Sequence, residues 1–200
     1  MNRKDMAEEE KGKKEKLHFV PNVPNILTMI RLIAILPLVI LLSKGPEYRT
    51  LSFVLFLAIW LTDILDGYIA RNYNQVTDFG KLFDPLVDKL FQIAVAVTMA
   101  VTGRMPAWVP CFIIARETLM ILGGYLLLKN YEVVVYSDVF GKLATVCYVI
   151  ALSLLFVIPD EPVWLKHVVF IPGTALSVIA TLNYARKNIY NLKNGKNLTL

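Results

Sequence analysis

The sequence predicts an all-α integral membrane protein, with six transmembrane helices around a polar cavity that faces the cytoplasm. Three observations carry this prediction. The chain of 200 residues is 56% hydrophobic with a mean hydropathy of +0.54, it contains six apolar runs of nearly membrane-spanning length, and its Lys and Arg residues gather on one set of connections. Ordinary soluble domains are less apolar, so we expect a helical bundle in a bilayer.

The chain is expected to divide into three parts. Residues 1–20 form a short polar cytoplasmic tail with an interfacial segment, residues 21–187 form the membrane domain, and residues 188–200 form a second cytoplasmic tail. The first tail is not a signal peptide, because the apolar run after it is long enough to span a bilayer and lacks a small-residue cleavage site. The predicted spans are 26–42, 51–70, 82–102, 108–128, 139–158 and 164–184.

The positive charges predict the orientation of these spans. Outside them, thirteen Lys and Arg residues fall on the side of the two termini and four on the opposite side. The positive-inside rule therefore places both termini in the cytoplasm, in a multi-pass protein of the cell (inner or plasma) membrane. Because the basic residues stand at the ends of apolar segments, the net charge of +5 indicates anionic lipid and not a nucleic acid as the partner.

The sequence lacks the cysteine and histidine clusters that a zinc site, a redox site or a disulfide framework would need. Cys111 and Cys147 are far apart and lie inside apolar runs, and the chain has two histidines. The informative residues are the charged ones within or at the edge of the predicted spans, since a charge near a helix centre costs about 2.5–3.5 kcal/mol. These are Arg31, Asp63, Asp66, Asp84, Asp88, Lys89, Arg116, Glu117 and Lys142.

Four aspartates mark a candidate site. Two small residues and two acids share one face at the end of the second span, and one glycine and two acids share one face at the start of the third. The connection between these spans is short, so they are antiparallel neighbours and their carboxylates meet. The first face carries Asp63, Asp66, Gly67 and Ala70, and the second carries Gly80, Asp84 and Asp88.

Four neighbouring carboxylates repel one another strongly unless cations hold them. Oxygen ligands at a water-filled cavity suit Mg²⁺ or Mn²⁺, in two ions, and such ions favour a substrate with a pyrophosphate linkage. Arg71 adds a fixed charge for phosphate beside the small residues. A structural alternative is that the acids form ion pairs within the membrane: Asp63 and Asp66 with Arg71, and Asp84 with Lys81 or Lys89.

The run from Asp63 to Asp88 matches, without a gap, the signature of the CDP-alcohol phosphotransferase family, D-x2-D-G-x2-A-R-x8-G-x3-D-x3-D. Eight fixed positions at fixed spacing make the resemblance specific, and six helices around a cytoplasmic site agree with it. The resemblance implies that Asp63, Asp66, Asp84 and Asp88 hold a two-metal centre, with Asp88 also acting as the catalytic base. It further implies that CDP-diacylglycerol binds along Gly67, Ala70, Arg71 and Gly80.

Within this family, the residues from Pro24 to Arg31 resemble the opening of the phosphatidylglycerophosphate synthases. The resemblance implies glycerol 3-phosphate as the acceptor, with phosphatidylglycerophosphate and CMP as products. A small dianion needs several fixed cations. The expected acceptor-binding residues are Thr28, Arg31, Arg116 and Lys142.

Two positions depart from those synthases. Leu122-Gly123-Gly124 stands where they carry a further Arg, and Ala144 stands where they carry a second Lys. Fewer cations suit a less charged acceptor, so a cardiolipin synthase that uses phosphatidylglycerol stays open. So do single-residue alternatives: a snorkelling Arg31, an Arg116 paired with Glu117, and Lys142 as a helix-end charge.

Two unrelated classes of membrane protein also use clustered acidic residues. Intramembrane prenyltransferases hold Mg-pyrophosphate with acidic motifs that are widely separated in sequence, whereas these acids fall within one hairpin. A non-enzymatic divalent-cation transporter would explain clustered aspartates in a membrane, but it leaves Gly67, Ala70 and Arg71 without a role. Small residues such as Gly123 and Gly141 would suit close helix packing or a homodimer, and the sequence leaves the oligomeric state open.

Overall fold

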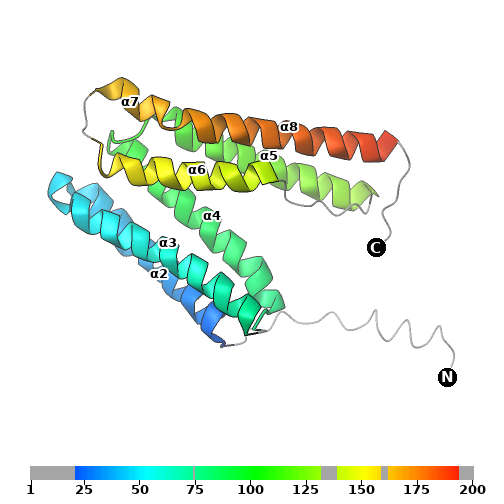
Figure 1. Ribbon diagram of the computed structural model, residues 1–200, viewed down its shortest axis with the longest axis horizontal. Coiled ribbons are helices and arrows are strands. Elements are labelled where there is room, and N and C mark those ends of the chain that lie inside the picture. Colours follow the sequence, from blue (N-terminus) through cyan, green and yellow to red (C-terminus); the bar gives the residue numbers. More distant parts are fainter. Residues whose placement is uncertain (1–20, 74, 132–138, 159–161, 194–200) are drawn as a thin grey trace. The chain divides into compact units, whose positions relative to one another are not determined.

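The computed structural model describes residues 21–73, 75–131, 139–158 and 162–193, and every regular element in these ranges is helical (Figure 1). The predicted tail 1–20, residues 159–161 of the fifth connection and residues 194–200 lie outside the described residues. The second predicted tail, 188–200, therefore lies partly outside them, and its first residues continue α8. The elements are α2 (Val23–Lys44), the 3-10 turn η1 (Pro46–Tyr48), α3 (Arg49–Asn72), α4 (Asp78–Val101), α5 (Trp108–Tyr131), α6 (Val139–Leu155), α7 (Val163–Val168) and α8 (Ile171–Lys193).

Three described segments are long and apolar enough to cross a bilayer: Val23–Lys44, Pro46–Asn72 and Val163–Lys187. The helix α6 is apolar but has 17 residues, and α4 carries acidic and basic side chains through its first three turns. The all-α fold and its apolar helices confirm that part of the prediction. The arrangement of six spans around a cavity stays a prediction.

The sixth predicted span is not one continuous helix. The structure ends α7 at Val168 and begins α8 at Ile171. Pro172, the second residue of α8, has no backbone N–H for the carbonyl of Val168, so an uninterrupted helix would lose a hydrogen bond there. Proline suits the first turn of a new helix instead, because those N–H groups have no helical partner.

The chain forms two compact units, and the helices α2, α3 and α4 each contribute one part to either unit. The described part of unit 1 consists of residues 21–34 and 58–90, which are the first half of α2, the second half of α3 and the first half of α4. Unit 2 consists of residues 35–57 and 91–193 in the described part. All four aspartates of the candidate site belong to unit 1.

Unit 2 is held by aromatic packing and by the pairing of α6 with α8, which lie side by side in Figure 1. Phe53 stacks on Phe156 with ring centroids 5.2 Å apart. The Tyr148 hydroxyl lies 3.1 Å from the Thr174 hydroxyl, which ties α6 to the first turn of α8. Arg49 donates to the carbonyl of Leu155 at 2.7 Å and satisfies a helix-end acceptor of α6.

Two helices of unit 1 begin at side-chain caps that fix where the site starts. The Asn22 side chain accepts a hydrogen bond from the backbone N–H of Asn25 at 3.0 Å, which caps α2. The Thr77 hydroxyl accepts one from the N–H of Gly80 at 3.0 Å, which caps α4. These caps fix the first turns of α2 and α4, six residues before Thr28 and seven residues before Asp84 respectively.

Candidate active site

The acidic cluster is built by three helices of unit 1. The last turns of α3 carry Asp63 and Asp66, the first turns of α4 carry Asp84 and Asp88, and α2 contributes Arg31 and Thr28. The structure thus brings the two aspartate faces to the same region, as their spacing and the short connection predict. Sequence reasoning assigned Arg31 and Thr28 to the acceptor, whereas here both contact the acids.

Arg31 is the counter-charge of two aspartates. Its side chain is fully buried, and its two terminal nitrogens separate onto two carboxylates: Nη1 lies 2.5 Å from Oδ1 of Asp63, and Nη2 pairs with Oδ2 of Asp66. Asp66 is itself 3% exposed, so the pair is removed from solvent. A buried charge persists only with such a partner, which explains why Arg31 is tolerated inside an apolar helix.

Thr28 connects the two acidic faces. Its hydroxyl lies 2.7 Å from Oδ1 of Asp84 and 3.4 Å from Oδ2 of Asp66, and it also bonds back to the carbonyl of Pro24 at 3.1 Å. One oxygen atom is therefore within reach of a carboxylate from α3 and of one from α4. Thr28 is completely buried, so this hydroxyl is a fixed part of the cluster.

Asp88 belongs to the same electrostatic group. It is half-buried on the next turn of α4, and it interacts through its charge with Asp63, Arg31 and Lys89. Asp66 likewise interacts with Asp63 and Asp84, so each acid is coupled to at least one other. The four carboxylates therefore form one electrostatic group, and a charge brought to one of them acts on the others.

The donor set fits hard divalent cations, although the carboxylates are not arranged as a finished metal site. Within the described ranges, no three Asp, Glu, His or Cys side chains are grouped closely enough to bind one ion. Arg31 stands between Asp63 and Asp66, and Thr28 stands between Asp66 and Asp84. Carboxylate and hydroxyl oxygens are the ligands that Mg²⁺ and Mn²⁺ prefer. The buried Nε of Arg31 has no hydrogen-bond partner among the described residues, so the two carboxylates satisfy only part of this guanidinium.

Gly80 lets α4 approach α2 closely. A Cβ at this position would stand 2.8 Å from Oδ1 of Asn25, which is closer than real Cβ atoms come, and a tight 3.1 Å from the Thr77 hydroxyl. Asn25 is 1% exposed, and its amide nitrogen lies 3.1 Å from the Thr77 oxygen. Sequence reasoning missed Asn25 and Thr77. The signal was available, because Thr77 precedes an acidic first turn and is a typical helix cap.

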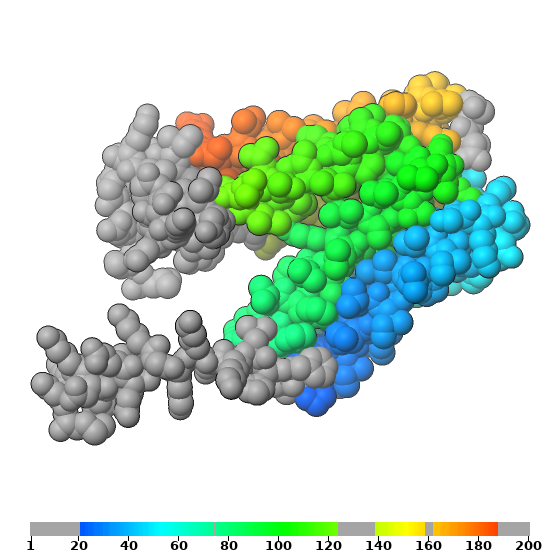
Figure 2. All heavy atoms as spheres, turned by 180° about the vertical axis from the view of Figure 1, so that it is seen from behind, coloured from blue at the N-terminus to red at the C-terminus, as the bar shows by residue number. Residues whose placement is uncertain are grey.

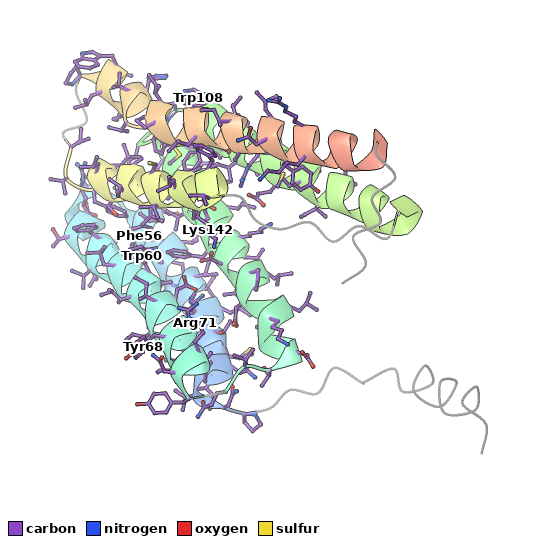
Figure 3. All side chains as sticks on the ribbon, turned by 45° about the vertical axis from the view of Figure 1, so that its right-hand side comes forward. Phe56, Trp60, Tyr68, Arg71, Trp108 and Lys142 are labelled. Atoms are coloured by element: carbon purple, nitrogen blue, oxygen red, sulfur yellow. The ribbon has the colours of Figure 1, made fainter. Side chains whose placement is uncertain are left out.

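The small residues of α3 lie next to Arg71 of the same helix. The Arg71 guanidinium folds back over Gly67, where a Cβ would stand 3.6 Å from Nη2. Arg71 is exposed, and Figure 3 shows it near the end of α3 together with Tyr68, which is 60% exposed. Ala70 is half-buried one residue before Arg71. The expected CDP-lipid residues on α3 are therefore at least partly accessible, and the long side chain of Arg71 lies beside Gly67.

The ion pairs differ from the structural alternative raised by the sequence. Asp63 and Asp66 pair with Arg31 from α2 and not with Arg71 from their own helix. Lys81 pairs with Asp78 at 2.7 Å, on an exposed surface, and not with Asp84. The acids that match the family signature are thus held together by a residue that the helical spacing alone does not select.

The other two expected acceptor residues, Arg116 and Lys142, lie in unit 2. Arg116 pairs with neighbouring Glu117, as one of the alternatives proposed, and its guanidinium lies against Gly141, where a Cβ would stand 3.7 Å from Nη2. Lys142, the next residue of α6, is exposed (Figure 3). Arg116 of α5 therefore contacts α6 at the residue before Lys142, while the convergence of both cations with Arg31 of unit 1 stays a prediction.

Comparison with known proteins agrees with the geometry of the acidic cluster. The family model for CDP-alcohol phosphatidyltransferase matches residues 21–180, which contain the whole candidate site. The chain belongs to the CDP-alcohol phosphatidyltransferase family. It is therefore a membrane transferase of phospholipid biosynthesis, and its acids occupy the positions of the family signature.

Several relatives carry more specific names. The chain is 38% identical over 136 residues to a CDP-diacylglycerol–glycerol-3-phosphate 3-phosphatidyltransferase of Rickettsia typhi, which covers 67% of this chain and 75% of the relative. It is 34% identical over 148 residues to the protein of that name in Bacillus subtilis, covering 67% and 76%. A probable phosphatidylglycerophosphate synthase of Mycobacterium tuberculosis is 29% identical over 182 residues, covering 86% and 84%.

Proposed function

We propose that the protein transfers the phosphatidyl group of CDP-diacylglycerol to glycerol 3-phosphate, giving phosphatidylglycerophosphate and CMP. The observation that carries the proposal is the gathering of Asp63, Asp66 and Asp84 around Thr28 and Arg31 in unit 1. The names of the relatives from Rickettsia and Bacillus support the choice of both substrates.

Asp63, Asp66, Asp84 and Asp88 would hold two divalent cations, Mg²⁺ or Mn²⁺. When bound, such ions neutralise the pyrophosphate and stabilise the charge that develops on the leaving phosphate. Arg31 and Thr28 hold the carboxylates of Asp63, Asp66 and Asp84 in position, so little reorganisation is needed when the substrate arrives. Gly67, Ala70, Arg71 and Gly80 would line the path of the CDP-lipid.

The reaction is an in-line displacement at the β-phosphorus. The acceptor hydroxyl forms the new oxygen–phosphorus bond, the bond from that phosphorus to the bridging oxygen breaks, and CMP departs with the electron pair. Asp88 takes the hydroxyl proton, because it is the one acid of the cluster whose side chain forms no ion pair or hydrogen bond with Arg31 or Thr28 among the described contacts. Both substrates reach this site from the cytoplasm, where we place it with both termini.

Arg116 and Lys142 would bind the phosphate of the acceptor. The contact of Arg116 with Gly141, the residue before Lys142, supports this role, since two cations from different helices can bind one dianion. Replacing Arg116 or Lys142 by Ala should raise the KM for the acceptor more than the KM for CDP-diacylglycerol. Lys44→Ala, at an exposed cation outside the expected pocket, is the matched control. An unchanged acceptor KM in both variants would remove them from the acceptor site.

The deciding experiment is CMP release by the purified chain in detergent with CDP-diacylglycerol and Mg²⁺. Glycerol 3-phosphate and phosphatidylglycerol are offered separately. We expect release with glycerol 3-phosphate alone. Release with phosphatidylglycerol alone would make the protein a cardiolipin synthase, the alternative favoured by Leu122 and Ala144, and would refute the proposed acceptor. Metal uptake into vesicles without CMP release would instead indicate a cation transporter.

A further inference from the structure

A small cavity in unit 2 lies between α4, α5 and α6 and is lined in part by Arg116. Its volume is about 10 Å³, which is the space that one water molecule or one hydroxyl group needs. The polar side chains in its wall are Gln92, Arg116, Glu117, Thr145 and Tyr148. The cavity therefore offers a place for a single oxygen atom beside the cation that is expected to bind the acceptor phosphate.

Most of the polar groups around this cavity already have partners. Arg116 pairs through Nη1 with Glu117, and the Thr145 hydroxyl donates to a backbone carbonyl of its own helix at 3.1 Å. The Tyr148 hydroxyl lies 3.1 Å from a threonine hydroxyl of α8. These contacts fix the wall of the cavity and leave few groups to recognise a ligand.

Two polar groups beside the cavity have no partner. The side chain of Gln92 is half-buried and forms no hydrogen bond with any residue in the described ranges. The Nε of Arg116 is buried and likewise has no hydrogen-bond partner there. A side-chain amide supplies two donors and one acceptor, and Nε–H supplies one further donor. One hydroxyl group can donate to the amide oxygen and accept from an N–H, so it matches these unused groups.

The position of Arg116 is fixed by three helices. A Cβ on Gly141 of α6 would stand 3.7 Å from Nη2 of Arg116 and 3.9 Å from the Cβ of Ala180 of α8. In Figure 2, α5 and orange α8 lie side by side, in agreement with the contacts between these helices. Because the guanidinium is enclosed in this way, it holds a bound phosphate at a defined distance from the cavity.

The helical period relates Gln92 to the acidic residues of α4. Gln92 follows Asp84 by eight residues and Asp88 by four, so the three side chains leave this continuous helix on one face. Four residues of an α-helix rise by about 6 Å. The face that begins with carboxylates thus continues, one turn later, with a neutral amide.

We infer that Gln92 is a specificity-determining residue that binds the hydroxyl group next to the one that attacks phosphorus. The inference rests on the proposed function, in which one terminal hydroxyl of glycerol 3-phosphate attacks and Arg116 binds the phosphate. The central hydroxyl of this acceptor forms and breaks no bond to phosphorus. It is a neutral donor and acceptor, which a side-chain amide matches. A site built to hydrogen-bond a hydroxyl disfavours an analogue without it, because the polar groups of the site then stay unpaired.

The test compares glycerol 3-phosphate with 3-hydroxypropyl phosphate, which lacks only the central hydroxyl. CMP release by the full chain in detergent, with CDP-diacylglycerol and Mg²⁺, gives kcat/KM for each acceptor. We expect wild type to favour glycerol 3-phosphate by at least about tenfold and Gln92→Met by less than about threefold. Methionine keeps the length of the side chain and removes the amide. Both acceptors are measured on the same preparation, so a partly unfolded variant does not change the ratio.

Two further variants separate recognition from packing. Thr98→Val is the matched control on α4, because the Thr98 hydroxyl donates to the carbonyl of Ala94 in its own helix at 2.7 Å. It should keep the wild-type ratio. Ala144→Val fills the cavity from α6, where Ala144 is 2% exposed, and should lower the ratio as Gln92→Met does.

The outcomes distinguish this inference from the proposed function. Equal ratios in wild type and Gln92→Met, or a wild type that uses both acceptors equally well, would overturn the inference alone. Absence of CMP release with glycerol 3-phosphate would refute the proposed function. Phosphatidylglycerol and phosphatidylpropanediol, which differ by the same hydroxyl, then replace the two acceptors, and the same comparison of ratios decides the inference. No release with either pair would overturn both.

Discussion

At the residue scale, Arg31 holds the acidic cluster together. It is fully buried between Asp63 and Asp66, and no other described basic residue pairs with either acid. Removing one partner of a buried pair is far more costly than losing a surface pair, at about 3–5 kcal/mol, because the remaining charge stays desolvated. Because the Arg31 guanidinium occupies oxygens of both carboxylates, it competes with any metal cation that Asp63 and Asp66 bind.

Arg31→Gln should therefore lower the thermal midpoint in EDTA and make stability more dependent on Mg²⁺. The cation should raise the midpoint of the variant more than that of wild type, because it replaces the lost guanidinium charge. Thermal unfolding in detergent, with and without Mg²⁺, measures both effects. Lys81→Gln, which breaks an exposed pair with Asp78, should change little. An equal Mg²⁺ shift in Arg31→Gln and wild type would argue against ion binding at these carboxylates.

Asp88→Asn tests the catalytic base without changing side-chain size. A general base typically contributes about 10²–10⁴-fold, so CMP release should fall by at least about a hundredfold. Binding of CDP-diacylglycerol should stay measurable, because the three other acids and Arg71 are unchanged. Asp78→Asn removes a carboxylate from the exposed start of α4 and should retain activity. Full turnover in Asp88→Asn would exclude Asp88 as the base.

At the scale of helices, the contact of α4 with α2 depends on a missing side chain. Gly80→Ala should destabilise the protein and reduce activity, because the added Cβ displaces Asn25 and breaks its bonds with Thr77. Gly123→Ala in α5 is the matched control: its Cβ would meet Tyr184 at an ordinary 3.8 Å, and alanine favours a helix by about 1 kcal/mol. Thermal midpoints should move in opposite directions. A stabilised Gly80→Ala would show that α2 and α4 are not in close contact there.

The helices show what sequence periodicity can and cannot predict. Hydropathy located all six apolar segments, but it placed the third start at 82, whereas α4 begins at Asp78 because Thr77 caps it. Polar first turns are invisible to hydropathy. The interruption before α8 follows from Pro172, a local signal within the predicted span 164–184. The prediction of one continuous helix followed the apolar composition of this span and ignored the proline.

The candidate site divides in the same way. The meeting of the aspartate faces follows from the spacing i, i+3 and i, i+4 and from a short connection. The pairing of Arg31 with Asp63 joins residues 32 apart on different helices, and no local period encodes it. Likewise the hydroxyl of Thr28 reaches Asp84 across 56 residues, so sequence reasoning could mark Thr28 as polar but not name its partner.

For the whole molecule, the distribution of cations gives the chain a direction in the membrane. Thirteen Lys and Arg residues stand on the predicted cytoplasmic side against four on the other. Two of those four bond to backbone carbonyls: Arg49 to Leu155 at the end of α6, and Lys166 to Gly103. Local interactions thus account for these two exceptions, and the orientation rule applies to the remaining cations outside the spans.

The orientation itself can be measured by labelling single cysteines. In a background with Cys111→Ala and Cys147→Ala, a membrane-impermeant maleimide is applied to intact spheroplasts that express either Lys44→Cys or Asp78→Cys. Both positions are exposed, so reactivity depends on the side of the membrane. We expect label on Lys44→Cys at once and on Asp78→Cys after the membrane is opened. The reverse pattern would put the aspartates outside the cell, away from cytoplasmic CDP-lipid and glycerol 3-phosphate, and would contradict the proposed reaction together with the topology.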